Sequence, residues 1–122
     1  AMMFAHHYKL DNFCAIIDNN GLQIDGDVAK VMNPYPIAEK PRAFGIAVAA
    51  LDGNDFDQLE AAFTAARGTK GVPFAIVMKT VKGKGVSYME NNAGWHGKAP
   101  NDEEYETAMK ELRAQLAEVE AM

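Results

Sequence analysis

Apolar residues gather in blocks along the chain, and three of these blocks have the length of β-strands. They are Phe13–Ile17, Ile46–Leu51 and Phe74–Met78. None of the three alternates with polar residues, which is typical of strands that are buried on both faces of a parallel sheet. The pattern therefore predicts three buried strands.

Helical patterns lie between these strands. The clearest covers Asp55–Arg67, with Asp55 as N-cap and Gln58 as its capping-box partner. A shorter helix is expected within Ile37–Phe44, where Pro41 is tolerated only near a helix start or a kink. The order strand, helix, strand, helix, strand predicts an α/β fold with a parallel sheet of at least three strands and flanking helices.

The two ends of the chain also have helical patterns. The opening residues, AMMFAHHYKL, resemble the last turns of a helix without its cap, so we expect a boundary of the sequence there rather than the start of a domain. The final helix is expected to start at Asn101 or Asp102, and its apolar stripe should dock on the sheet or on a partner subunit. The stripe consists of Tyr105, Met109, Leu112, Leu116 and Val119.

Two loops are the candidates for chemistry. Asp18, Asn19, Asn20 and Gly21 follow the first strand, and ligands of open α/β sheets bind at the carboxyl ends of the strands. The segment 79–100 is long, rich in glycine and without periodicity, which is typical of a functional or disordered loop. Three of its lysines, Lys79, Lys82 and Lys84, could meet phosphate groups, but a solvated face of the loop is the stronger expectation.

Composition and charge narrow the classes of function. A chain of 122 residues with 48% hydrophobic residues can bury one modest core. Of its 17 acids and 12 bases, seven acids and two bases lie in residues 101–122, which leaves a neutral body and makes nucleic acid an unexpected partner. No apolar run approaches the roughly 20 residues of a membrane span, and no signal peptide is evident, so a cytoplasmic protein without a membrane partner is expected. The single cysteine, Cys14, is expected to be a small buried hydrophobe.

Several familiar motifs do not fit. Asp18 and Asn20 resemble the start of a calcium loop, but Ala29 stands where the bidentate glutamate is needed. Lys82 and Lys84 lie among glycines, but neither the P-loop motif Gly-x-x-x-x-Gly-Lys-Ser/Thr nor the dinucleotide-binding motif Gly-x-Gly-x-x-Gly is present there. The adjacent His6 and His7 are about 100° apart on a helix, so a metal role is less expected than a surface one.

Five blocks of sequence together resemble the transketolases, which are enzymes that depend on thiamine diphosphate. The blocks are YKLDNFCAIIDNNGLQIDG, PIAEKPRAFG, LDGNDFDQLEAAF, KTVKGKGVSYMEN and WHGKAPNDEEY. The resemblance is strongest to transketolases whose two halves are separate polypeptides. It implies that residues 1–122 are the second half of the diphosphate-binding domain.

The resemblance also implies site residues. Asn20 and the backbone carbonyl of Leu22 match ligands of the Mg²⁺ ion that holds thiamine diphosphate, and His96 matches a catalytic histidine beside the cofactor and the donor sugar. The Gly-Asp-Gly half of the cofactor motif, with its anionic ligand, is absent from these residues. We therefore expect this chain alone to bind Mg²⁺ and cofactor weakly and to be inactive.

The implied activity is transfer of a two-carbon ketol unit from a ketose phosphate to an aldose phosphate, as in the pentose phosphate pathway. Expected partners are sugar phosphates and the remaining transketolase domains or subunit, in a homo- or hetero-oligomer. Two alternatives remain open. One is a non-catalytic α/β interaction module, and the other is a piece of a different thiamine diphosphate enzyme, such as deoxyxylulose-phosphate synthase or a dehydrogenase E1 subunit.

Overall fold

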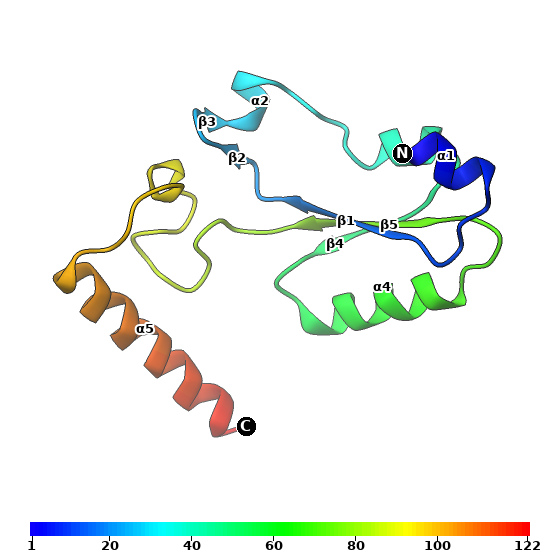
Figure 1. Cartoon of the computed structure of the whole chain (residues 1–122). Helices are drawn as coiled ribbons and strands as arrows, with labels where there is room; N and C mark the ends of the chain where they lie inside the picture. Colours follow the sequence, from blue (N-terminus) through cyan, green and yellow to red (C-terminus); the bar gives the residue numbers. More distant parts are fainter.

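The protein is built around a small parallel sheet. The structure, a computed structural model, describes residues 1–122. Its main sheet has the strand order β1-β5-β4, where β1 is Cys14–Asn19, β5 is Phe74–Lys79 and β4 is Ala47–Asp52. Both pairings are parallel, so the predicted fold class is confirmed (Figure 1).

The last strand in the sequence is the central strand of the sheet. β5 pairs with β1 on one side and with β4 on the other, and Ala75 and Ile76 at its middle are 0% exposed. Of the three predicted strands, β5 is therefore the one that is buried on both faces.

Helices cover the two faces unequally. α4 (Phe56–Gly68) lies against β4 and β5, where Ala62 packs with Phe74 and Ile76 (Figure 1). Asp55 caps α4 as predicted, and its carboxylate accepts hydrogen bonds from the amides of Asp57 and Gln58. The core sits between this helix and the strands β4 and β5.

The opposite face carries two shorter helices. α3 (Glu39–Ala43) contacts β4, and Pro41 is buried in its first turn, where the missing N–H costs no helical hydrogen bond. α1 (Met2–His7) lies nearby, and the His6 imidazole fills the space above Gly45. A Cβ on Gly45 would overlap with the His6 imidazole, and the φ of +77° also favours glycine.

The prediction that the first strand is buried on both faces is wrong for β1. Phe13 is 39% exposed and Ile16 is 53% exposed, and the Cys14 thiol is exposed rather than buried. The reason is the strand order, which makes β1 an edge strand, while α4 lies over β4 and β5. One face of β1 and its outer edge therefore have no cover.

A small hairpin and a short helix follow β1. β2 (Leu22–Gln23) pairs antiparallel with β3 (Gly26–Asp27), and α2 (Val28–Val31) follows directly. The Asp27 carboxylate caps α2 by accepting a hydrogen bond from the Ala29 amide at 2.8 Å. The loop after β1 is thus a compact hairpin beyond the carboxyl end of the strand (Figure 1).

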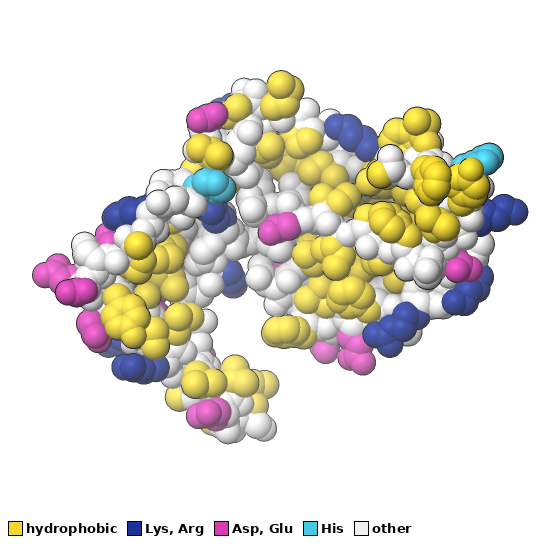
Figure 2. Space-filling model, viewed as in Figure 1, with side chains coloured by type: hydrophobic (Ala, Val, Ile, Leu, Met, Phe, Trp, Pro, Cys, Tyr) yellow, Lys and Arg dark blue, Asp and Glu magenta, His cyan; other side chains and the backbone are white.

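The last helix does not dock on the sheet, contrary to one of the two predicted arrangements. After the 3₁₀ turn η1 (Ala93–Trp95), α5 (Asp102–Glu120) extends away from the body, and open space separates it from α4 (Figure 2). Its predicted apolar stripe is largely exposed, with Leu116 at 55% and Val119 at 66%. A neighbouring face of α5, containing Ala108 and Glu111, contacts the segment after β5 instead.

Candidate functional site

The three parallel strands end in a row of polar side chains. Asn19, Lys79 and Asp52 are the last residues of β1, β5 and β4, and the register places them side by side. Paired residues of neighbouring strands point to the same face of a sheet, so these groups lie together at its carboxyl edge. Ligands of open α/β sheets bind at this edge.

Hydrogen bonds fix the start of the loop after β1. The Tyr35 hydroxyl donates to Asn19 Oδ1 at 3.0 Å, and the Thr80 hydroxyl donates to the Asp18 carboxylate. These two contacts join three separate segments of the chain, since Tyr35 lies in the link before α3 and Thr80 follows β5. The carboxyl ends of β1 and β5 are therefore held together by side chains as well as by the sheet.

A cavity of about 450 Å³ opens beside this row. Its polar rim contains Asn19, Tyr35, Asp52 and Lys79, and its remaining lining is mostly apolar. Lys79 forms no ion pair and is exposed, so its ammonium group can meet an anion. The cavity thus combines an apolar floor with a few polar groups, as small-molecule sites do.

Asn20 and Leu22 can supply part of a Mg²⁺ site. The Leu22 amide donates to Asn20 Oδ1 at 2.9 Å, which orients the Asn20 side chain within the turn. An amide oxygen has two lone pairs, so Asn20 Oδ1 can still meet a cation. Amide and carbonyl oxygens suit a hard cation, but these two ligands are neutral, and no cluster of three acidic, histidine or cysteine side chains is present. The residues therefore fit one part of a magnesium site and leave the charged part to other groups.

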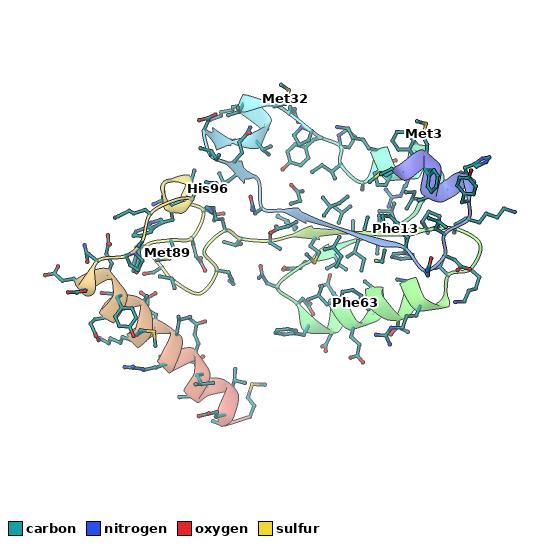
Figure 3. The ribbon with its side chains drawn as sticks, in the orientation of Figure 1. Met3, Phe13, Met32, Phe63, Met89 and His96 are labelled. Atoms are coloured by element: carbon teal, nitrogen blue, oxygen red, sulfur yellow. The ribbon has the colours of Figure 1, made fainter.

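His96 lies on the loop between η1 and α5, on the side of the sheet toward which the strands point (Figure 3). Its backbone N–H donates to the Ala93 carbonyl at 3.0 Å, while its imidazole is exposed and has no hydrogen-bond partner. Gly97 directly follows it, and Gly94 precedes it by two residues. The imidazole is therefore free to meet a ligand from solvent.

The segment between β5 and η1 is ordered by its own contacts. The Asn91 amide donates to the Lys82 carbonyl at 2.9 Å, and the Gly85 amide donates to Glu90 Oε1 at 2.9 Å. Gly83 has a φ of +74°, and a Cβ there would lie 2.6 Å from the Met89 carbonyl oxygen. This region is thus a folded loop rather than a disordered one, and Gly83 allows the backbone to approach the Met89 carbonyl closely.

Sequence reasoning missed three members of the site. Lys79, which the sequence pattern assigns to a solvated loop, ends β5 inside the polar row. Tyr35 and Thr80 have no role in the pattern, yet each bonds to the end of β1. The position of Lys79 directly after the apolar block Phe74–Met78 was the available signal, since the other two predicted strands are also followed by a polar residue.

No helix of the structure combines the length and the apolar character that crossing a membrane requires.

Comparison with known proteins identifies the family of this chain. Residues 1–118 match the family model described as "Transketolase, thiamine diphosphate binding domain". The chain is 38% identical over 120 residues to one of the subunits of the apulose-4-phosphate transketolase of Phocaeicola vulgatus, and the match covers 98% of this chain and 43% of the relative. It is 35% identical over 117 residues to the 6-deoxy-6-sulfo-D-fructose transketolase subunit SqwG of a Clostridium species, covering 96% of this chain and 42% of the relative.

A solved structure supports the same assignment. The transketolase of Campylobacter jejuni superimposes with a TM-score of 0.82 at 29% identity, over 89% of this chain and 17% of that one. The chain therefore spans less than half the length of the relatives it matches. The family match over residues 1–118 shows that this chain belongs to the transketolase family.

Proposed function

We propose that this chain supplies the diphosphate side of the active site in an enzyme that transfers a two-carbon ketol unit from a ketose phosphate to an aldose phosphate. The observation that carries the proposal is the match of residues 1–118 to the thiamine diphosphate-binding domain of transketolases. The polar row at the carboxyl edge of the sheet and the accessible His96 support it. Two relatives whose names state a transketolase activity are themselves subunits, which favours a chain that works with a separate partner.

Each proposed role follows from the chemistry of the residue. Asn20 Oδ1 and the Leu22 carbonyl would help to hold a Mg²⁺ ion, whose positive charge would offset the negative charge of the diphosphate. Lys79, which has no anionic partner of its own, would offset the negative charge of phosphate oxygens. The His96 imidazole would donate a hydrogen bond to a substrate oxygen or exchange a proton with it near neutral pH. When bound, thiamine diphosphate supplies the carbon nucleophile that ketol transfer requires.

We further propose that the 122-residue chain is inactive without the rest of a transketolase. Two facts support this. The chain spans 43% of its relative from Phocaeicola vulgatus. Its two proposed magnesium ligands, Asn20 and the Leu22 carbonyl, are both neutral. Binding of a divalent cation strengthens as charged ligands are added, and these two residues supply none. The expected partners are therefore the remaining domains of a transketolase or its second polypeptide. We also expect the enzyme to be cytoplasmic.

A hybrid enzyme tests the proposal. The matched segment of the Phocaeicola vulgatus relative is replaced by this chain, and the hybrid is assayed for the apulose-4-phosphate transketolase activity that the relative's name states. We expect His96→Ala to lower kcat by about a hundredfold while the cofactor still binds, since acid–base groups contribute about 10²–10⁴-fold. We expect Asn20→Ala to weaken the Mg²⁺-dependent binding of thiamine diphosphate in a calorimetric titration.

Two matched variants serve as controls. His7→Ala changes an exposed histidine of α1, and Asn12→Ala changes an exposed asparagine whose side chain makes no hydrogen bond. Both should leave turnover and cofactor affinity unchanged. Full turnover of His96→Ala, or unchanged cofactor affinity of Asn20→Ala, would contradict the corresponding role. Ketol transfer from xylulose 5-phosphate to ribose 5-phosphate by the 122-residue chain alone would contradict the proposed inactivity.

A further inference from the structure

A cluster of four side chains fastens the loop that carries His96 to the start of α5. The cluster consists of Tyr88, Trp95, Lys98 and Glu104. Trp95 directly precedes His96, and Lys98 follows it by two residues, so anchored side chains lie on both sides of the histidine. The proposed function gives His96 a role but assigns none to these four residues.

Trp95 is held by Tyr88. The indole Nε1 donates to the Tyr88 carbonyl at 3.1 Å, and the two ring centroids are 5.2 Å apart at 54°. The Tyr88 hydroxyl in turn donates to the Glu104 carbonyl oxygen at 2.6 Å. Trp95 is therefore connected to the first turn of α5 through Tyr88.

Lys98 makes the second connection. Its Nζ lies 2.9 Å from Glu104 Oε1 and 4.2 Å from the centroid of the Trp95 ring. The other oxygen of Glu104 accepts the Asn101 amide at 2.8 Å, as part of the capping box of α5. The hydrogen bond from the Asn101 amide and then that from Lys98 lower the pKa of the Glu104 carboxyl, which favours its charged form.

His96 has no comparable anchor of its own. Its imidazole has no hydrogen-bond partner, and a flexible glycine, Gly97, directly follows it. The place of the imidazole is therefore set by the residues on either side of it. Of these, Trp95 and Lys98 are the two whose side chains are fixed to α5 through Tyr88 and Glu104.

We propose that Lys98 and Glu104 are a positioning pair for the transketolase reaction, which holds the His96 loop against α5 and sets the place of the imidazole at the site. This inference rests on the role of His96 in the proposed function. The pair touches neither substrate nor cofactor and acts through Trp95 and the loop backbone. Displacing a reacting group by about 1 Å can lower turnover as much as about a hundredfold, so loss of the pair should affect kcat.

The first experiment uses the fluorescence of Trp95, the single tryptophan of the chain. Lys98→Met keeps the aliphatic stem but removes the cation from the indole ring, and it should shift the Trp95 emission. Lys110→Met is the matched control, because Lys110 is an exposed lysine of α5 without a salt bridge. Identical emission of Lys98→Met and the unsubstituted chain would overturn the contact on which the inference depends.

The second experiment measures turnover in the hybrid enzyme described above. We expect Lys98→Met and Glu104→Gln to lower kcat by about tenfold, with the dissociation constant for thiamine diphosphate unchanged. Lys98→Arg retains the charge and the bond to Glu104, and it should restore most of the turnover. Lys110→Met should have no effect. A merely structural role would instead lower cofactor affinity and turnover together.

A double variant separates the failure of the positioning role from the failure of the proposed function. If Lys98 acts through His96, then His96→Ala/Lys98→Met has the same residual turnover as His96→Ala. A further loss in the double variant, or full turnover of Lys98→Met where His96→Ala is impaired, would overturn the positioning role and leave the proposed function intact. Full turnover of His96→Ala would overturn both, since the positioned group would then have no function.

Discussion

Two isoleucines in one row of the sheet offer a direct test of the strand order. Ile16 on β1 and Ile76 on β5 are partners in the register, so they point to the same face. Ile76 is 0% exposed, whereas Ile16 is 53% exposed. Truncating each to alanine removes the same atoms from two very different environments.

The expected effects differ by roughly threefold. Ile76→Ala should lower the free energy of unfolding by about 2–5 kcal/mol, because it removes buried methyl groups and leaves a cavity beside Ala62 and Phe74. Ile16→Ala should cost about 0.5–1.5 kcal/mol, since roughly half of that side chain already meets water and no enclosed cavity forms. With 11 of 122 residues buried, the chain has a small core, so the larger loss should unfold a visible fraction of it.

Urea unfolding followed by circular dichroism measures both changes. The midpoint should fall for each variant while the slope stays constant, as expected when only stability changes. Equal losses for Ile16→Ala and Ile76→Ala would refute the arrangement. They would mean that the uncovered face of β1 is buried in solution, and the oligomeric state would then identify a second copy as its cover.

Three further predictions concern the loop after β5 and α5. Gly83→Ala should lower stability by about 1–3 kcal/mol, because its φ is +74° and its Cβ would meet the Met89 carbonyl; Gly97→Ala, with open space around it, is the control in the same thermal melt. Leu116→Gln should change the free energy of unfolding by less than about 0.5 kcal/mol, because this side chain is 55% exposed. A large loss of stability would show that the apolar stripe of α5 is buried against another surface. Hydrogen bonds lower the pKa of the Glu104 carboxyl below its ordinary value of 4.5. The stabilisation that this carboxylate contributes is therefore complete above pH 4.5, and it is lost as the pH falls through the lowered pKa. The Trp95 emission should therefore stay constant from neutral pH to about 5 and change at lower pH, and a change already complete above pH 5 would contradict this assignment.

The pattern of apolar residues was enough to predict the strands and the longest helix of the body. Unbroken apolar blocks predicted all three strands of the main sheet within two residues at each end. Asp55 marked the start of α4 because an N-cap needs only local geometry, and Asn101 caps α5 for the same reason. These features depend on residues that are close in sequence, so the sequence is sufficient for them.

The structure shows how the proposed site residues are placed, but it does not test their roles. Asn20, Leu22 and His96 were selected by resemblance, and the structure places the first two in one tight turn. It does not bring His96 into contact with them, and the roles of all three stay predictions. The sequence pattern assigns Lys79 to a loop because its position in a row with Asn19 and Asp52 depends on which strands are neighbours.

The sequence by itself determined the local elements of this protein, namely where strands and helices begin and which residues cap them. The tertiary structure alone decided that β5 lies between β1 and β4, that Ile16 is exposed, and that α5 contacts the loop after β5 rather than the sheet. The physical reason is that strand order depends on pairing between residues far apart in the sequence, since Phe74 pairs with Cys14 on one side and with Ala47 on the other. A run of apolar residues is the same in a central strand and in an edge strand, and only the neighbours distinguish them.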